Sequence, residues 1–298
     1  MSKFSLVCSS YKSEVYLQQF LENVNLFDNA KDLTLYLVLN DPSSFEKKII
    51  SKASGLKYSL EVIEVERESI SKSTNRGFKL CQTEFVGYLD VDDLHPPNSY
   101  KIMLNTLDNC ELTYGDAQVI QSNGLKFATD YLKPFSQSAA KIKPIFGPTH
   151  FFRRSLLETV GYWDEQLISA ADYDWQIRAS AIAKVKKTNA ICTFYNFSPL
   201  SASRGFVNLV ENLVIALRYH NLCNVGPYIE YLEEALKYDI QYCYYNNTKN
   251  SVTKFLSAYE ANFLKQNKKQ LQESFGIKKL IKYLILNLAN KINLNLKK

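Results

Sequence analysis

The sequence predicts an α/β protein in which helices flank a mostly parallel, doubly wound central sheet. The first observation is an alternation of short apolar runs with segments of helical periodicity, which extends to about residue 90 and is typical of such sheets. The second is a purely helical pattern of apolar residues from Arg204 onward. We therefore expect an α/β domain in residues 1–205 and a helical region in residues 206–298.

Four strands are expected in the first part of the chain, each an apolar run that ends at turn-forming residues. The runs occupy residues 4–9, 33–39, 58–65 and 85–89. Helical periodicity fills the intervals between them, at about residues 15–24, 44–53 and 71–81. Ser13 is expected to cap the first of these helices, because serine is a preferred N-cap residue.

The pattern becomes less regular after Pro97. Residues 122–144 are polar and lack periodicity, which predicts a long loop, and loops of this length in compact domains are often functional. The remaining expected elements are a helix at 99–107, a bent strand or strand pair at 112–120, a strand entering a short helix at 146–155, a turn at 161–165, a helix at 172–183 and a strand at 184–194.

An acidic cluster follows the expected strand at 85–89. Asp90, Asp92 and Asp93 lie within four positions, although aspartate is a poor strand former and is costly to bury without a partner. Three such carboxylates repel one another unless a cation lies between them, and Mg²⁺ and Mn²⁺ take oxygen ligands of this kind. The cluster therefore predicts a divalent metal site; a solvated acidic turn that caps the next helix is the alternative.

Polar residues also follow two other expected strands, at 9–11 and 40–41. The carboxyl ends of parallel strands meet at one edge of a sheet, and ligands of open α/β sheets bind beyond those ends. We therefore expect these residues to share an edge with the acidic cluster and to form a ligand site there.

Composition argues against several classes of function. Residues 276–298 hold six lysines and no acidic residue and account for the net charge of +6, so the rest of the chain is nearly neutral and no nucleic-acid partner is expected. The six cysteines form no C-x-x-C pair and no G-x-S-x-G motif accompanies the three histidines, which argues against a zinc site and a serine hydrolase. Scattered cysteines, expected as buried reduced thiols, and a short apolar run at the N-terminus predict a cytoplasmic protein.

Residues 277–298 combine apolar residues at helical spacing with interspersed lysines. A basic amphipathic helix of this kind binds in the plane of an anionic membrane, which would place the protein peripherally on the inner face of the cell membrane. A helix docked on the protein's own core, or a contact between two copies, is an equal alternative, because amphipathicity does not identify the partner.

Seven segments follow a known pattern in order along the chain: FSLVCSSY at 4–11, LVLNDPS at 37–43, NRG at 75–77, YLDVDD at 88–93, FGPT at 146–149 with FRRSLL at 152–157, GYWDE at 161–165 and ADYDWQIR at 171–178. Together they resemble the family 2 inverting glycosyltransferases, which use nucleotide sugars and have the GT-A fold, a Rossmann-like α/β architecture. The resemblance covers about two hundred residues, and its specificity comes from the order of the segments rather than from any one of them.

The resemblance implies how a nucleotide-sugar donor would bind. Ser9 and Tyr11 would line the nucleobase pocket, and Asp41 would accept a hydrogen bond from the base. Asp90 and Asp92 would contribute to nucleotide binding and, with Asp93, would hold the ribose and the metal.

The resemblance also implies a metal ion, Mn²⁺ or Mg²⁺, held by Asp92 and Asp93. One position departs from the family pattern, because Thr74 stands where many members carry an arginine. Lys72 is expected to supply the missing positive charge to the diphosphate, with Arg67 as the alternative.

Asp172 matches the position of the family's general base. A carboxylate there would take the proton of an acceptor hydroxyl as it attacks the sugar. The alternative is that Asp172 only caps the helix that runs to residue 183, since aspartate is a leading cap residue. Asp174 is expected to contact Arg178 four residues later on the same helix.

The sequence thus predicts an inverting, metal-dependent glycosyltransferase that moves a sugar, preferably from a UDP-sugar, to a saccharide or lipid-linked saccharide in the synthesis of a surface glycan of the O-antigen or capsule type. Asn40, Thr74 and Ala171 depart from the family pattern and keep a non-catalytic sugar-nucleotide-binding protein as an alternative. A nucleotidyltransferase is a further alternative, but residues 9–13 are not the glycine-rich, basic loop that such enzymes use.

Overall fold

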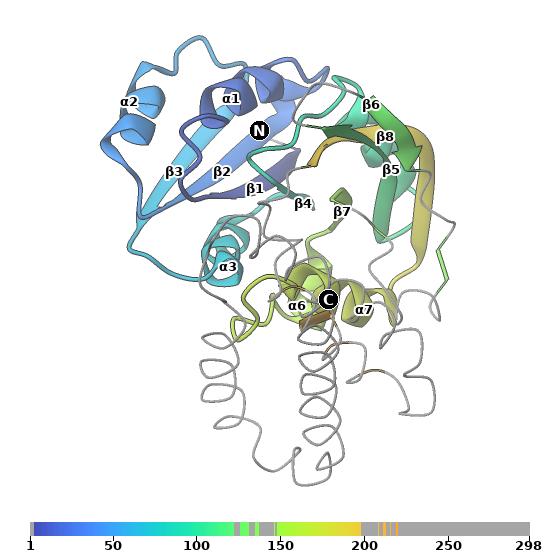
Figure 1. The fold of residues 1–298 in the computed structure, drawn as a ribbon. Helices are drawn as coiled ribbons and strands as arrows, with labels where there is room; N and C mark the ends of the chain where they lie inside the picture. Colours follow the sequence, from blue (N-terminus) through green and yellow to red (C-terminus); the bar gives the residue numbers. More distant parts are fainter. Residues whose placement is uncertain are drawn as a thin grey trace, which may run out of the picture.

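The computed structural model describes residues 3–121, 126–130, 135–136, 146, 148–197 and the separate positions 208, 211, 212, 215 and 219. Within these residues an eight-stranded sheet forms the centre, and helices cover both of its faces (Figure 1). The strand order is β3-β2-β1-β4-β7-β5-β6, with β8 paired to β5. The predicted α/β architecture is confirmed.

The first four strands are β1 (Phe4–Ser10), β2 (Leu33–Asn40), β3 (Ser59–Val65) and β4 (Phe85–Leu89). They pair in parallel, with Ser10 opposite Leu39 and Cys8 opposite Leu89. The carboxyl ends of β1, β2 and β4 therefore lie along one edge of the sheet. This places the polar residues that follow them along that edge, as predicted.

The second half of the sheet has mixed directions and contains β5 (Leu112–Gln121), β6 (Lys126–Asp130), β7 (His150–Arg153) and β8 (Val185–Phe197). β7 runs antiparallel to β4 and β5, and β8 runs parallel to β5. The expectation of a continuous loop at 122–144 is wrong for residues 126–130, which form β6. This polar strand has no apolar pattern of its own and is defined by its antiparallel pairing with β5.

The helices are α1 (Leu17–Asn25), α2 (Ser44–Lys52), α3 (Ile70–Leu80), α4 (Ser99–Leu107), α6 (Ser155–Val160) and α7 (Ala171–Ser180), with a short 3₁₀ turn, η1, at Ala30–Asp32. The expectation that Ser13 caps α1 is wrong, because the N-cap residue is Tyr16. The Ser13 hydroxyl instead donates to Glu46 Oε1 at 2.9 Å. Glu46 is a buried carboxylate that needs such donors.

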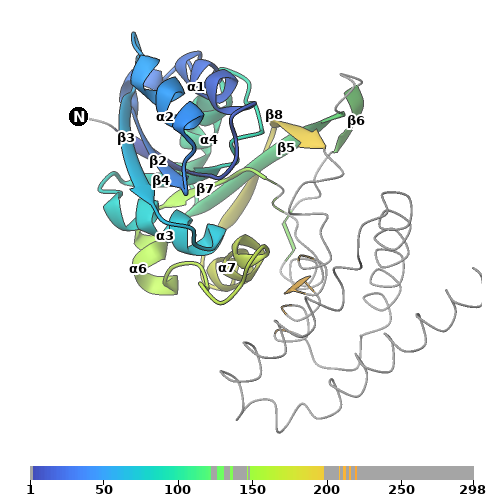
Figure 2. The same ribbon diagram turned by 60° about the vertical axis from the view of Figure 1, so that its left-hand side comes forward.

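The apolar core has two parts, one on each face of the sheet. Leu6 packs in the same cluster as Phe20 of α1, whereas its neighbour Val7 packs in the other cluster with Phe78 of α3 and Trp175 of α7. Successive residues of a strand point to opposite faces, so helices on both sides explain why every residue of β1 is buried. Figure 2 shows α1, α2 and α4 on one side of the sheet and α3, α6 and α7 on the other. The cysteines within the described residues are buried free thiols, as expected: Cys8, Cys81, Cys110 and Cys192.

The described positions beyond residue 205 are all helical. Ile215 belongs to the core cluster on the α7 side of the sheet. The rest of residues 206–298, including the basic amphipathic segment at 277–298, and the predicted domain boundary near residue 205 lie outside the described residues. In the part of the chain that the structure describes, no helix has the length and apolar character needed to cross a membrane.

Candidate functional site

The acidic cluster lies directly beyond β4 and is tied to its surroundings by three hydrogen bonds. The Tyr88 hydroxyl donates to Asp90 Oδ1 at 2.9 Å, and the Asp93 N–H donates to the Asp90 carbonyl oxygen at 3.3 Å. Asp93 is buried, and its Oδ1 accepts from the backbone N–H of Asn196 on β8 at 2.8 Å. Its Oδ2 is buried and has no hydrogen-bond partner among the described residues.

Burial and mutual repulsion raise the pKa values of the cluster. Burial, followed by the charge of Asp92, raises the pKa of Asp90 to about 7. Burial raises the pKa of Asp92, and burial together with the charge of Asp90 raises that of Asp93 well above its usual value. The described residues therefore provide too little positive charge to balance three carboxylates.

The cluster fits a divalent cation whose coordination is completed by the phosphates of a bound substrate. Among the described residues, no group of three or more His, Cys, Asp or Glu side chains is arranged to hold a metal ion by itself. Mg²⁺ is usually held by one or two carboxylates together with substrate phosphates. The free Oδ2 of Asp93 and the partly buried carboxylate of Asp92 match that smaller requirement.

Asp172 lies in the first turn of α7, and the N-cap residue of this helix is Ala170. The alternative that Asp172 only caps this helix is therefore wrong, because Ala170 is the cap residue. Burial raises its pKa to about 6, although the N–H groups of Tyr173 and of Asp172 itself lower it. The charge of Asp172 in turn contributes to the raised pKa of Asp90, after burial and the charge of Asp92.

The other carboxylate of α7 has a structural role. Asp174 is buried and accepts from Arg178 Nε at 2.9 Å, which confirms the expected contact four residues along the helix. It also accepts from the Tyr219 hydroxyl at 2.9 Å. Asp172 therefore differs from Asp174, whose bonds to Arg178 and Tyr219 hold the fold together.

Helix α3 anchors the segment that leads into α7. The Asn75 side chain accepts from the Trp163 N–H at 3.1 Å and donates to the Trp163 carbonyl oxygen at 2.9 Å. The Ser71 hydroxyl donates to the Leu167 carbonyl oxygen at 2.8 Å. Trp163 packs on Tyr88, with 4.9 Å between ring centroids. These contacts hold the start of α7 against the end of β4.

The residues expected to bind the nucleobase lie at the carboxyl ends of β1 and β2 or just beyond them. Ser9 is buried and is the second-last residue of β1. Tyr11 lies just beyond that strand, and the Arg67 guanidinium carbon lies 3.5 Å from the centroid of its ring. Asp41 follows β2 in the left-handed region, with φ of 54°, and its N–H donates to the Val65 carbonyl oxygen at 2.8 Å. The three expected residues therefore share the edge of the sheet to which the acidic cluster belongs, and their roles stay a prediction.

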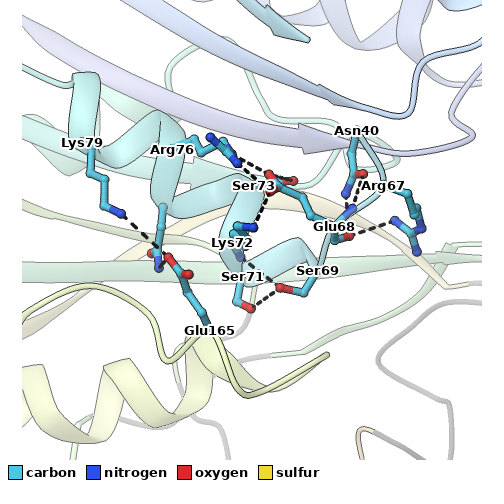
Figure 3. A network of polar contacts seen from close by, with 11 residues as sticks. Asn40, Arg67, Glu68, Ser69, Ser71, Lys72, Ser73, Arg76, Lys79 and Glu165 are labelled. Atoms are coloured by element: carbon cyan, nitrogen blue, oxygen red, sulfur yellow. Dashed lines mark hydrogen bonds and ion pairs between the residues drawn. The ribbon is translucent and has the colours of Figure 1, made fainter. Parts of the chain in front are cut away.

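Lys72 is engaged with the protein itself (Figure 3). Its Nζ lies 3.5 Å from Glu68 Oε2, and Arg76 Nε donates to the other oxygen of the same carboxylate at 2.8 Å. Although burial opposes it, hydrogen bonds from Arg76 and Ser73 lower the pKa of Glu68. Lys72 would have to leave this pair to bind a diphosphate, and its expected role stays a prediction.

Sequence reasoning missed three residues that support the site. Asn40 was read as a departure from the family pattern, yet its side chain donates to the Glu68 carbonyl oxygen at 2.9 Å and accepts from the Glu68 N–H at 3.0 Å (Figure 3). Asn75 was read only as part of a motif. Glu211 was not singled out, although an acidic residue four positions before Ile215, on the apolar face of an expected helix, is a signal for a buried carboxylate.

The fold and the acidic edge of the sheet define a protein of the GT-A type. The sequence model for glycosyl transferase family 2 matches residues 5–161, which is more than half of the chain. This chain belongs to that family.

Similar proteins agree with this assignment. The minor teichoic acid biosynthesis protein GgaB of Bacillus subtilis is 21% identical over 242 residues, which cover 70% of this chain and 27% of GgaB. The crystal structure of Staphylococcus aureus TarS residues 1–349 with UDP-GlcNAc has a TM-score of 0.59 at 19% identity and covers 80% of this chain and 73% of that one. The mannosyltransferase PcManGT of Pyrobaculum calidifontis, in complex with GDP-Man and Mn²⁺, has a TM-score of 0.58 at 17% identity and covers 99% of this chain and 88% of that one.

Proposed function

We propose that this chain is an inverting, metal-dependent glycosyltransferase that moves a sugar from a nucleoside-diphosphate sugar, preferably a UDP-sugar, to a hydroxyl of a surface glycan. Family membership and the acidic edge of the sheet support a sugar-nucleotide donor. GgaB is named for teichoic acid synthesis and TarS is a poly(ribitol-phosphate) N-acetylglucosaminyltransferase. These names favour a cell-surface polymer, such as an O-antigen or capsule, as the product.

One observation carries the proposal: Tyr88, whose hydroxyl binds Asp90 at the end of β4, packs on Trp163 of the segment that leads into α7, the helix of Asp172. Burial raises the pKa of both carboxyls, to about 7 for Asp90 and about 6 for Asp172. One of these groups comes from α7 and the other from the end of β4. An acidic cluster that binds a donor diphosphate and a separate carboxylate with a pKa near neutrality are the two parts that a single displacement at the anomeric carbon needs.

In the proposed reaction, the Asp172 carboxylate takes the proton from the acceptor hydroxyl. The oxygen then attacks the anomeric carbon from the side opposite the nucleoside diphosphate, which leaves with the bonding electrons, so the configuration at that carbon inverts. Asp92 and Asp93 would hold a divalent ion, which when bound stabilises the charge on the departing diphosphate. Tyr88 holds the Asp90 carboxylate in place through its hydroxyl.

The protein would act in the cytoplasm or on the inner face of the cell membrane. A saccharide acceptor fits the first location and a lipid-linked saccharide the second. In the second case, the lysines of residues 277–298 would attract an anionic lipid surface.

Thermal unfolding of the full chain with UDP-, GDP- and dTDP-sugars, with and without Mn²⁺, tests donor binding. A donor that binds only the folded protein raises its unfolding temperature in proportion to the logarithm of concentration over Kd. We expect a UDP-sugar to do so in the presence of Mn²⁺ and to be turned over with a suitable acceptor. A shift with a GDP-sugar would reassign the donor, and binding without turnover or hydrolysis would favour the non-catalytic alternative.

A further inference from the structure

Glu211 makes an unusual contact with the segment before α7. Its carboxylate is fully buried and accepts three backbone hydrogen bonds, from the N–H groups of Ile168 at 2.6 Å, Ser169 at 2.8 Å and Ala170 at 2.9 Å. The N-cap residue Ala170 has no side-chain oxygen to offer to the helix. A carboxylate from a distant segment therefore binds the chain where α7 begins.

The same helical face makes further contacts with α7 and the residues before it. Asn208 Nδ2 donates to Ser169 Oγ at 3.1 Å, and the Tyr219 hydroxyl donates to Asp174 Oδ1 at 2.9 Å. Ile215, between them, is fully buried in the core cluster that contains α7. Positions 208, 211, 215 and 219 recur at three or four residues, so they share one face of a helix. That face is docked on the start of α7.

We infer that Glu211 is a positioning residue for Asp172: it fixes the backbone of residues 168–170 and so holds the first turn of α7 where the base must act. This inference rests on the proposed function, which makes Asp172 the base. Glu211 itself touches no reacting atom. Its value lies in geometry, because a displacement of about 1 Å in a catalytic group can cost about a hundredfold in rate.

Glutamate suits this task better than a neutral residue. Hydrogen bonds from N–H groups to a carboxylate are about twice as strong as those between neutral groups, and a negative charge is favourable at a helix N-terminus. A glutamine at position 211 would present one carbonyl oxygen and one NH₂ group. The NH₂ group would face backbone donors, and at least one of the three N–H groups would be left without an acceptor.

The Glu211 charge also acts on the base directly. It raises the pKa of Asp172, and among the described residues Asp90 at the end of β4 is a further charged group that interacts with Asp172. Removal of the Glu211 charge should therefore lower the pKa of Asp172. The acidic limb of the pH–rate profile should move to lower pH in a neutral variant.

The test compares Glu211→Gln with Tyr219→Phe in the full chain. Both variants lose contacts from the same helical face, but Tyr219→Phe keeps the Glu211 carboxylate and removes the hydroxyl bond to Asp174. We expect Glu211→Gln to lower kcat about a hundredfold, to leave the donor KM within about twofold, to shift the acidic limb to lower pH and to speed amide hydrogen exchange at residues 168–170. Tyr219→Phe should leave the rate, the pH profile and the exchange at 168–170 unchanged.

Two outcomes of the comparison between Glu211→Gln and Tyr219→Phe overturn the inference. The first is a Glu211→Gln variant with the rate and exchange of the parent protein. The second is an equal loss of rate in both variants with no shift of the acidic limb, which would make the contact one of docking alone. If Glu211→Gln does not fold, Glu211→Asp replaces it as the test, because aspartate keeps the charge on a shorter side chain. In this variant kcat should fall while the acidic limb of the pH–rate profile stays where it is in the parent protein. An unchanged kcat refutes the inference. Amide exchange at residues 168–170 needs no turnover. It therefore still tests whether Glu211 fixes this backbone if a fully active Asp172→Asn variant shows that Asp172 is not the base.

Discussion

The side chain of Asn75 holds the backbone of Trp163 by two hydrogen bonds, one accepted at 3.1 Å and one donated at 2.9 Å. An amide side chain here pairs with a peptide group as a neighbouring strand would. Because Trp163 packs on Tyr88, this pair joins α3, the end of β4 and the segment before α7. The distance between the acidic cluster and the proposed base depends on it.

Asn75→Ala should destabilise the protein by about 3 kcal/mol, because it leaves two buried backbone groups without partners at about 1–3 kcal/mol each. Urea unfolding measures the change. Asn98→Ala is a matched control, since Asn98 is an exposed helix-cap residue whose side chain makes no cap hydrogen bond, and surface changes usually stay within about 0.5 kcal/mol. Equal stabilities of the two variants would contradict the role given to Asn75.

Asp172→Asn should remove transfer while it spares donor binding. The amide has the shape of the carboxylate but cannot take the proton, and loss of a general base typically costs on the order of 10²–10⁴ in rate. The parent enzyme should also lose activity as the pH falls through about 6, because the carboxyl must be ionised to act as a base. Turnover by the variant at the parent rate would refute the base assignment.

Asp92→Ala should abolish the effect of Mn²⁺ on donor binding. The proposed metal site has few protein ligands, so the loss of one removes a large part of it. Thermal unfolding with a UDP-sugar, with and without Mn²⁺, measures this. Asp108→Asn, at the exposed end of α4, should keep the parent response, and a variant Asp92→Ala that still responds to Mn²⁺ would show that the ion binds elsewhere.

The metal-free protein should lose stability as the pH rises. The pKa of Asp90 is about 7 in the folded protein against a usual value of 3.8, so the folded state binds this proton more tightly than the unfolded chain. The stabilisation is complete below pH 3.8 and is lost as the pH rises through about 7. Asp90→Asn should reduce this decline and raise the unfolding temperature above pH 7 by a few degrees. An unfolding temperature that depends on pH as it does in the parent would contradict the assignment.

Gly77→Ala should destabilise the protein although alanine favours helices by up to about 1 kcal/mol. A Cβ at position 77 of α3 would overlap Val7 Cγ1 on β1, and overpacking of a core usually costs about 1–3 kcal/mol. The double variant Gly77→Ala/Val7→Ala relieves the overlap, so a double-mutant cycle should show a favourable coupling between the two changes. Strict additivity would mean that the helix moves away from the strand at no cost.

Much of the fold could be predicted because most elements carry their own signal. β4 (Phe85–Leu89) and α4 (Ser99–Leu107) have the expected bounds, since each has an apolar pattern and a clear start. β6 could not be predicted in this way, because Lys126–Asp130 is a polar segment that becomes a strand through its partner β5. Ser13 was misread because its hydroxyl serves Glu46, 33 residues away.

The candidate site also contains residues that the sequence reveals and residues that it does not. The carboxylates of the acidic cluster and Asp172 are visible in the sequence, since each stands beside a recognisable strand or helix. Their supports are not visible, because Asn75 and Glu211 bind the backbones of segments 88 and 41–43 residues away. Side chains that bind distant peptide groups leave no periodic pattern in the sequence.

The bond between Asp93 and the N–H of Asn196 spans 103 residues. A ribosome adds about 5–20 residues per second, so roughly 5–20 s pass between the synthesis of the aspartate and that of its partner. During this interval the nascent chain already carries the acidic cluster but lacks the strand that satisfies it. The pairing of β8 with the rest of the sheet is therefore a late step in the synthesis and folding of the protein. Until it occurs, Asp93 lacks the N–H of Asn196 and the site is incomplete.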